Sequence, residues 1–196
     1  MKHPVLRFLL LVFIFLLFSL PFKAMSLIPG FTNVRPVDAL GPIYAVFYGP
    51  IGCLAIACGN LISDVIDDAL RWSSLAGFSA NFLGPFLVWL FWHRWAKHPF
   101  ALRNIRQLLI HTALLGAVAI LECAIITPAV AIAYPDVNAS FFACCVLFNT
   151  SFFPIFLSIP MTILMQEELG FRFFRNPSEP MPKNVASSPS ATEDKL

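Results

Sequence analysis

The sequence predicts an all-α membrane protein with six transmembrane segments, the second and third of them short or re-entrant, and with both termini cytoplasmic. Of its 196 residues, 58% are hydrophobic and 12% are charged, and the mean hydropathy is +0.77. This balance lies outside that of soluble globular domains. The apolar runs are continuous and do not alternate with period two, which favours membrane helices over a transmembrane barrel.

The first apolar run covers residues 4–22 and has two interpretations. Basic residues precede it and the small residues Ala24 and Ser26 follow it, as in a cleaved signal peptide. Its length, however, approaches the roughly 20 residues that cross the hydrocarbon core as a helix. We therefore favour a retained first membrane helix.

Residues 32–68 combine an apolar stretch with charged and amide side chains. Pro42 and the Gly49-Pro50 pair interrupt this stretch, so the sequence predicts two short helices, over about residues 36–48 and 50–66, that meet at a turn. Pro50 suits the first turn of a helix, where its missing N–H is not needed. These helices are the second and third segments.

Three longer segments follow, over residues 75–92, 107–133 and 141–165, and a basic loop over residues 93–106 separates the first two. We expect three tryptophans at the end of the fourth segment to anchor it at the membrane interface: Trp89, Trp92 and Trp95. Residues 1–175 then form one polytopic helical membrane domain. Residues 176–196 have no apolar run, which predicts a disordered cytoplasmic tail.

The Lys and Arg residues test whether residues 32–68 cross once or enter and return. With six segments and the N-terminus inside, the outer side holds Lys23, Arg35 and Arg71. The inner side, without the distant Lys195, holds Lys2, Arg7, Arg94, Lys97, Arg103, Arg106, Arg172, Arg175 and Lys183. This is a positive-inside bias, and a single pass through residues 32–68 would remove it. Two spanning helices and a re-entrant hairpin both satisfy the count.

Small residues at four-residue spacing mark faces on which helices can approach closely in lipid. One such face carries Ala55, Gly59 and Ser63, and another carries Ala113 and Ala117. We expect these faces to pack against neighbouring helices.

Polar side chains at membrane depth are candidate binding residues, because burying them is expensive and usually marks a site or pathway. Asn60 and Asp64 are four residues apart and share one helix face. Asp64 can also be a solvated residue of the outer interface. Arg35 and Asp38 precede the second segment, where Asp38 is either a capping carboxylate or part of the outer mouth of a pocket.

Glu122 lies near the middle of its predicted helix, with His111 three turns earlier on the same face. A structural hydrogen bond is the alternative to a binding role for Glu122. The mid-span amides Asn81 and Asn149 more often join helices than bind ligands. The predicted substrate-binding set is Arg35, Asp38, Asn60, Asp64, Trp72, Asn81 and Glu122, with Trp72 as a stacking group.

No residue set predicts catalysis, and we expect no enzyme activity. Residues 167–172, EELGFR, match the EExxxR motif of intramembrane CAAX-type proteases, but no histidine follows Arg172 to complete a catalytic site. We interpret this segment as a cytoplasmic helix end. The 5 cysteines lie in or beside apolar segments without a CxxC pair, so neither a metal nor a cofactor is predicted.

Residues 35–42, RPVDALGP, resemble a signature of the substrate-binding S components of energy-coupling factor transporters, especially the queuosine-precursor transporter-like group. Residues 49–52 and 59–64 are similar to the glycine-rich second half of that family, and the resemblance covers roughly residues 28–92. It implies a six-helix protein that captures a small micronutrient outside and releases it inside, driven by an ATPase pair through a membrane scaffold subunit. The first helix lacks the small-xxx-small pattern with which many S components dock the scaffold.

We expect a multi-pass cell-membrane protein that binds a small, polar, partly aromatic solute in its outer half. Its expected partners are that solute, the lipid bilayer, a membrane scaffold subunit and ATPase subunits, and no nucleic acid. The alternative is a non-transport sensory or assembly subunit. In that case the polar residues join helices and the basic loop 93–106 docks a cytoplasmic partner.

Overall fold

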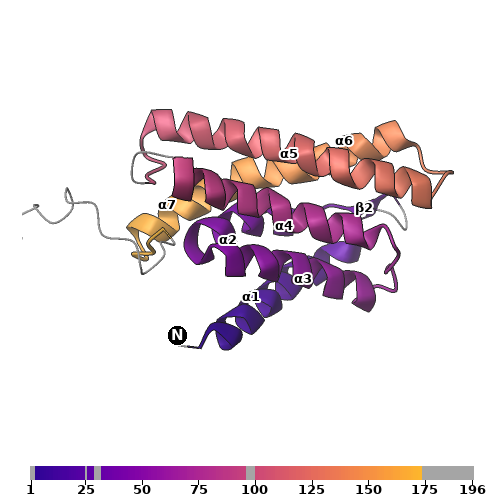
Figure 1. The fold of residues 1–196 in the computed structure, drawn as a ribbon, viewed down its shortest axis with the longest axis horizontal. Coiled ribbons are helices and arrows are strands. Elements are labelled where there is room, and N and C mark those ends of the chain that lie inside the picture. The colour runs from indigo at the N-terminus through magenta and orange to yellow at the C-terminus, as the bar shows by residue number, and fades with distance from the viewer. Residues whose placement is uncertain (1–2, 25, 29–31, 96–99, 174–196) are drawn as a thin grey trace, which may run out of the picture.

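The computed structural model describes residues 3–24, 26–28, 32–95 and 100–173 as a bundle of helices (Figure 1). The elements are α1 (Pro4–Ser19), η1 (Leu20–Ala24), β1 (Ser26–Ile28), β2 (Thr32–Asn33), η2 (Pro36–Ala39), α2 (Leu40–Tyr48), α3 (Pro50–Ile66), α4 (Ser74–Leu90), η3 (Phe91–Trp95), α5 (Ile105–Ala133), α6 (Ala139–Phe153), η4 (Pro154–Ser158) and α7 (Ile159–Glu167). The predicted tail, residues 176–196, lies outside the described residues.

Four helical stretches of the described chain are long and apolar enough to cross a bilayer: Pro4–Phe22, Ser74–Arg94, Ile105–Ala133 and Ala139–Glu167. The last of these is continuous through α6, η4 and α7. Such helices satisfy their own backbone hydrogen bonds, as a segment surrounded by lipid must. The chain is therefore a helical membrane protein.

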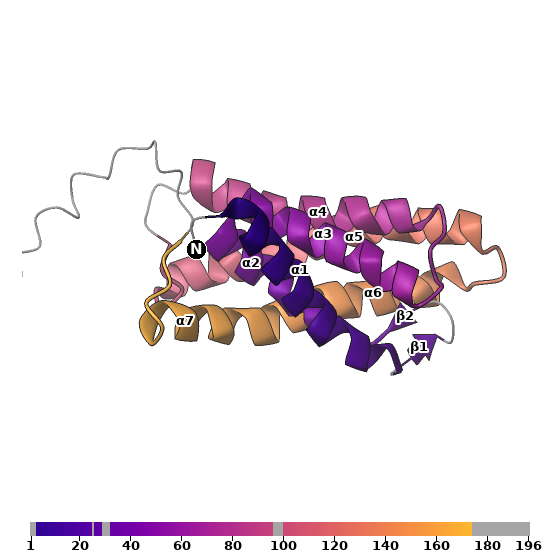
Figure 2. The same cartoon turned by 90° about the horizontal axis from the view of Figure 1, so that it is seen from below.

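The bundle has two chemically different ends. We call one the cavity end, formed by the β1–β2 hairpin, the α3–α4 loop and the connector from α5 to α6 (Figure 2). The other, the basic end, holds the start of α1, the α4–α5 loop and the end of α7. The short antiparallel pairing of β1 with β2 is an addition to the predicted all-α fold.

The second and third predicted segments form a helical hairpin, α2–α3, that breaks at Gly49. Gly49 has a φ of 61°, a left-handed conformation that disfavours residues with a side chain. Pro42 does not interrupt the hairpin as predicted, because it lies in the first turn of α2, where a missing N–H is tolerated. Every residue of α2 from Leu40 to Phe47 is buried, so this short helix forms the centre of the bundle.

Helix α1 packs against α3 along the predicted small-residue face. Ser63 and Ser19 share a hydrogen bond of 3.3 Å between their hydroxyl oxygens. The ring of Phe15, which is fully buried, lies directly over Gly59. These contacts confirm the predicted packing face on α3. The second predicted face does not pack against the described helices, because Ala113 and Ala117 are exposed.

We expect Gly59→Ala to destabilise the bundle by about 1–2 kcal/mol. A Cβ at this position would lie 2.6 Å from Cδ1 and 3.2 Å from Cβ of Phe15, and overpacking of about 1–3 kcal/mol outweighs the helix-propensity gain of about 1 kcal/mol. Gly116→Ala is the matched control, since nothing lies within 4 Å of its added Cβ. Thermal unfolding in detergent should give a lower midpoint for Gly59→Ala only. Equal midpoints for the two variants would contradict the described α1–α3 contact.

At the basic end, Trp92 is not the predicted interfacial anchor. It is only 6% exposed, and its Nε1 donates to Nδ1 of His111 at 3.0 Å. Trp92 is buried because this bond and the neighbouring ring of Phe100 hold it inside the bundle. Arg103 pairs with Glu167 at 2.6 Å, which joins the basic loop to the end of α7.

Candidate functional site

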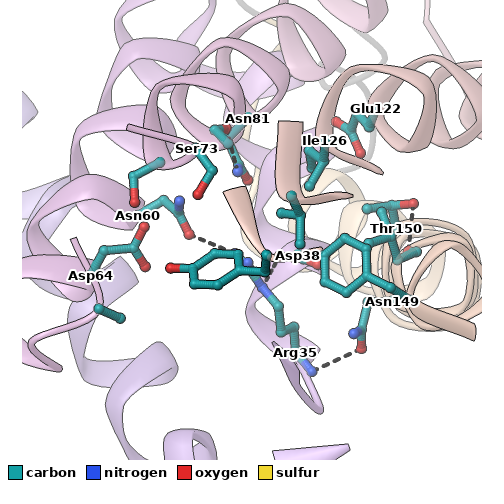
Figure 3. Close-up of a pocket in the computed structure, with 17 residues that line it drawn as sticks. Arg35, Asp38, Asn60, Asp64, Ser73, Asn81, Glu122, Ile126, Asn149 and Thr150 are labelled. Carbon is teal, nitrogen blue, oxygen red and sulfur yellow. Dashed lines mark hydrogen bonds and ion pairs between the residues drawn. The ribbon is translucent and has the colours of Figure 1, made fainter. Parts of the chain in front are cut away.

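A polar cavity of about 140 Å³ lies inside the cavity end (Figure 3). Its walls come from η2, α3, α4, α5 and α6, and it reaches the end of the bundle at Ala69, Ser73 and Tyr134. The lining is Arg35, Asp38, Asn60, Asp64, Ala69, Ser73, Ser74, Gly77, Asn81, Glu122, Ile126, Val130, Tyr134, Phe142, Val146, Asn149 and Thr150. Helices that are otherwise apolar thus surround a space rich in charged, amide and hydroxyl groups.

Arg35 joins the two sides of this cavity. Its Nη2 donates to Oδ1 of Asn60 on α3 at 2.7 Å, and its backbone N–H donates to Oδ1 of Asn149 on α6 at 3.0 Å. Its Nε lies 3.2 Å from Oδ1 of Asp38. Arg35 therefore connects the α2–α3 hairpin to α6.

Asp38 is only 9% exposed and lies in η2, which leads into α2. Its Oδ1 is paired with Arg35 by distance, but the geometry does not make a hydrogen bond, and no other donor reaches this oxygen among the described residues. A buried carboxylate oxygen without a hydrogen-bond donor is expensive. A donor group on a ligand would satisfy it.

Glu122 reaches the cavity from the middle of α5 and lies against Gly84 of α4. A Cβ on Gly84 would overlap Oε1 of Glu122 and lie 2.8 Å from its Cδ. Glycine therefore creates the space that the carboxyl group occupies between the two helices. No hydrogen bond to this carboxyl group is found among the described residues.

A smaller cavity of about 30 Å³ lies next to the first and shares its lining at Asp38, Asn81, Glu122 and Thr150. Its remaining lining is mostly apolar: Gly41, Pro42, Ile56, Gly84, Pro85, Val88, Leu115, Val118 and Pro154. The four shared residues form the boundary between the two cavities. We call them the floor of the polar cavity.

The structure brings together every predicted binding residue except Trp72. Arg35, Asp38, Asn60, Asp64, Asn81 and Glu122 all line the cavity. The side chain of Trp72 is 54% exposed in the loop before α4 and is not part of the lining.

The predicted binding set left out other polar lining residues, including Asn149, which the sequence analysis interpreted as an amide that joins helices. Asn149 and Thr150 form a polar pair within an apolar run, a signal that could have identified this wall. Ser73, Ser74 and Tyr134 lie at helix ends and carried no such signal. The described residues contain no group of three His, Cys, Asp or Glu side chains placed to hold a metal ion.

Comparison with known proteins finds no matching family model, no matching curated protein and no matching solved structure. The fold and the site alone therefore define the class of protein. It is a helical membrane protein with a polar cavity at one end of its bundle.

Proposed function

We propose that this protein binds a small polar solute in its cavity as the capture step of membrane uptake. One observation carries the proposal: charged and amide groups from five elements converge on a space of about 140 Å³ inside an apolar bundle. Polar groups at membrane depth are costly and usually belong to a substrate or ion pathway. Ligand sites in helical bundles are built in this way from facing side chains.

The cavity opens outward in this proposal. The basic end carries Arg7, Arg94, Arg103, Arg106 and Arg172 among the described residues, whereas the cavity end carries Lys23, Arg35 and Arg71. The positive-inside rule then assigns the basic end to the cytoplasm. The protein is thus a multi-pass protein of the cell membrane with six segments, α1, α2, α3, α4, α5 and α6–α7, and cytoplasmic termini.

We further propose that the protein acts as the S component of an ATP-driven transporter, with a membrane scaffold subunit and ATPase subunits as partners. The segments that resemble this family supply four lining residues: Arg35, Asp38, Asn60 and Asp64. Part of the resemblance therefore lies in residues that line the cavity. Co-purification of an ATPase complex would support this assignment, and its absence under conditions that preserve solute uptake would contradict it.

The alternative, a sensory or assembly subunit, places function at the basic loop. Gln166 donates to the Phe100 carbonyl at 3.3 Å, and Arg103 pairs with Glu167. These contacts hold the loop against α7, as a docking surface would require. Under this alternative, replacing loop arginines would abolish function, whereas replacing cavity residues would not.

The proposal is tested by native mass spectrometry of protein purified in mild detergent. We expect one solute per chain, and we expect Asn81→Leu to lower its occupancy at least ten-fold, because about 1.4 kcal/mol, the free energy of one hydrogen bond, corresponds to that factor. Among the described residues, the Asn81 amide donates only to Gly77 of its own helix, so folding should survive.

Ser79→Ala is the matched control for Asn81→Leu. Ser79 also donates to a carbonyl of its own helix, that of Leu75 at 2.8 Å, but it is exposed and does not line the cavity. Full occupancy in both variants, or an empty wild-type protein that still functions, would exclude the cavity as the solute site.

A further inference from the structure

The polar cavity is acidic. Among the described lining residues, the carboxylic acids are Asp38, Asp64 and Glu122, and Arg35 is the cation. The Arg35 guanidinium already contacts Asp38 and Asn60. Its positive charge is therefore directed mainly at Asp38, and no described Lys or Arg forms an ion pair with Glu122.

The floor of the cavity offers acceptors and few donors. One of the two side-chain N–H groups of Asn81 is used on the Gly77 carbonyl at 2.8 Å, and the Thr150 hydroxyl is used on the Val146 carbonyl at 2.9 Å. The Asn81 side-chain oxygen accepts no bond from any described residue. Together with the carboxyl groups of Asp38 and Glu122, it presents oxygen lone pairs to the boundary between the two cavities.

Two prolines add to this surplus of acceptors. Pro85 in α4 and Pro154 at the start of η4 both line the smaller cavity, and neither has an N–H. A proline removes the regular helical donor of the carbonyl four residues earlier. Those carbonyls belong to Asn81 and Thr150, which are the other two floor residues.

We propose that the cavity selects a small organic cation, whose protonated nitrogen lies at the floor between Asp38 and Glu122. This inference rests on the proposed function and names the substrate class. A cation with several N–H groups supplies the donors that the floor lacks and the charge that balances Glu122. The reverse arrangement, an anionic solute, would place a carboxylate or phosphate against two buried acids, which is strongly unfavourable.

The volume of the cavity limits the size of this solute. An engineered protein cavity of about 150 Å³ binds benzene, and the polar cavity measures about 140 Å³. A single six-membered ring therefore fills it, and a small cationic substituent on that ring can reach the floor. Val146 and Phe142 supply apolar contacts for the ring.

Benzamidine, benzamide and benzoate test this inference, because they share one shape and differ in charge. Each is titrated into the purified full-length protein in lipid nanodiscs, with calorimetry and thermal unfolding as readouts. We expect benzamidine to bind at least ten-fold more tightly than benzamide, and benzoate not to bind. Glu122→Gln should reduce the preference for benzamidine over benzamide to less than three-fold.

Glu168→Gln is the matched control, since it removes the same charge from an exposed position beyond α7 and should leave the preference unchanged. The ratio of the affinities for two ligands is insensitive to a general loss of folding.

Equal binding of benzamidine and benzamide to the wild type, or tighter binding of benzoate, would overturn the cation inference and leave solute binding intact. Stabilisation by Na⁺ relative to K⁺ at equal ionic strength, lost in Glu122→Gln, would assign the floor to an inorganic ion and also overturn it. Binding of none of the three, in a protein that carries no solute, would overturn both proposals.

Discussion

Arg35→Ala is expected to destabilise the protein by about 2–3 kcal/mol. Removing one partner of a buried ion pair costs about 3–5 kcal/mol, because the other charge is left unpaired. Arg35 is 31% exposed, so solvent screening reduces the loss. Asp38, only 9% exposed, and Asn60 both lose their guanidinium partner. Thermal unfolding in detergent should show a midpoint about 5–10 °C lower, given about 2–4 °C per kcal/mol for a chain of this size.

Three further variants separate pairing from other effects of Arg35→Ala. Arg71→Ala removes an exposed arginine that donates to the neighbouring Leu70 carbonyl, and it should change stability by less than about 0.5 kcal/mol. Asp38→Asn alone and combined with Arg35→Ala complete a double-mutant cycle. The double variant should be more stable than the sum of the single losses predicts. Strict additivity would show that the two side chains do not interact.

Gly52→Ala is expected to cost about 3 kcal/mol and to disrupt the α2–α3 hairpin. Its Cβ would lie 2.5 Å from the backbone oxygen of Tyr44 and 2.9 Å from the carbonyl carbon. These are main-chain atoms of a helix that is buried on every side, so they cannot move away as a flexible side chain could. Overpacking of this kind exceeds the helix-propensity gain of about 1 kcal/mol.

Gly77→Ala provides the comparison for Gly52→Ala. It is also a helical glycine, but its added Cβ would meet Nδ2 of Asn60 at 3.6 Å, an ordinary van der Waals distance. Its unfolding midpoint should stay close to that of the wild type. If Gly52→Ala is equally stable, the close approach of the two hairpin helices is incorrect.

The sequence predicts this fold to the extent that local chemistry determines it. Apolar length defines the long helices, and the left-handed preference of Gly49 locates the hairpin turn. The four-residue spacing of Asn60 and Asp64 places both on one helix face, and both line the cavity. These are properties of single helices, and they can be predicted from the sequence alone.

Features that depend on packing between helices were not predictable. Trp92 is a tryptophan near a helix end, which is typical of an interfacial anchor. His111, which is distant in the sequence, supplies a buried hydrogen-bond acceptor for its N–H. A proline such as Pro42 can either break a helix or lie in its first turn. Only the position of the η2–α2 junction shows that Pro42 lies in a first turn. Gly84 is an unremarkable helical glycine until Glu122 is placed against it.

The bond from the Arg35 backbone to Asn149 spans 114 positions of the chain and has a consequence for biosynthesis. Chains are made and inserted from the N-terminus, at about 5–20 residues per second. The hairpin with Arg35, Asp38 and Asn60 therefore enters the membrane well before the α6 wall exists. During that interval its polar groups need lipid headgroups, water or insertion factors as partners. The cavity is then completed late, when α6 joins the bundle.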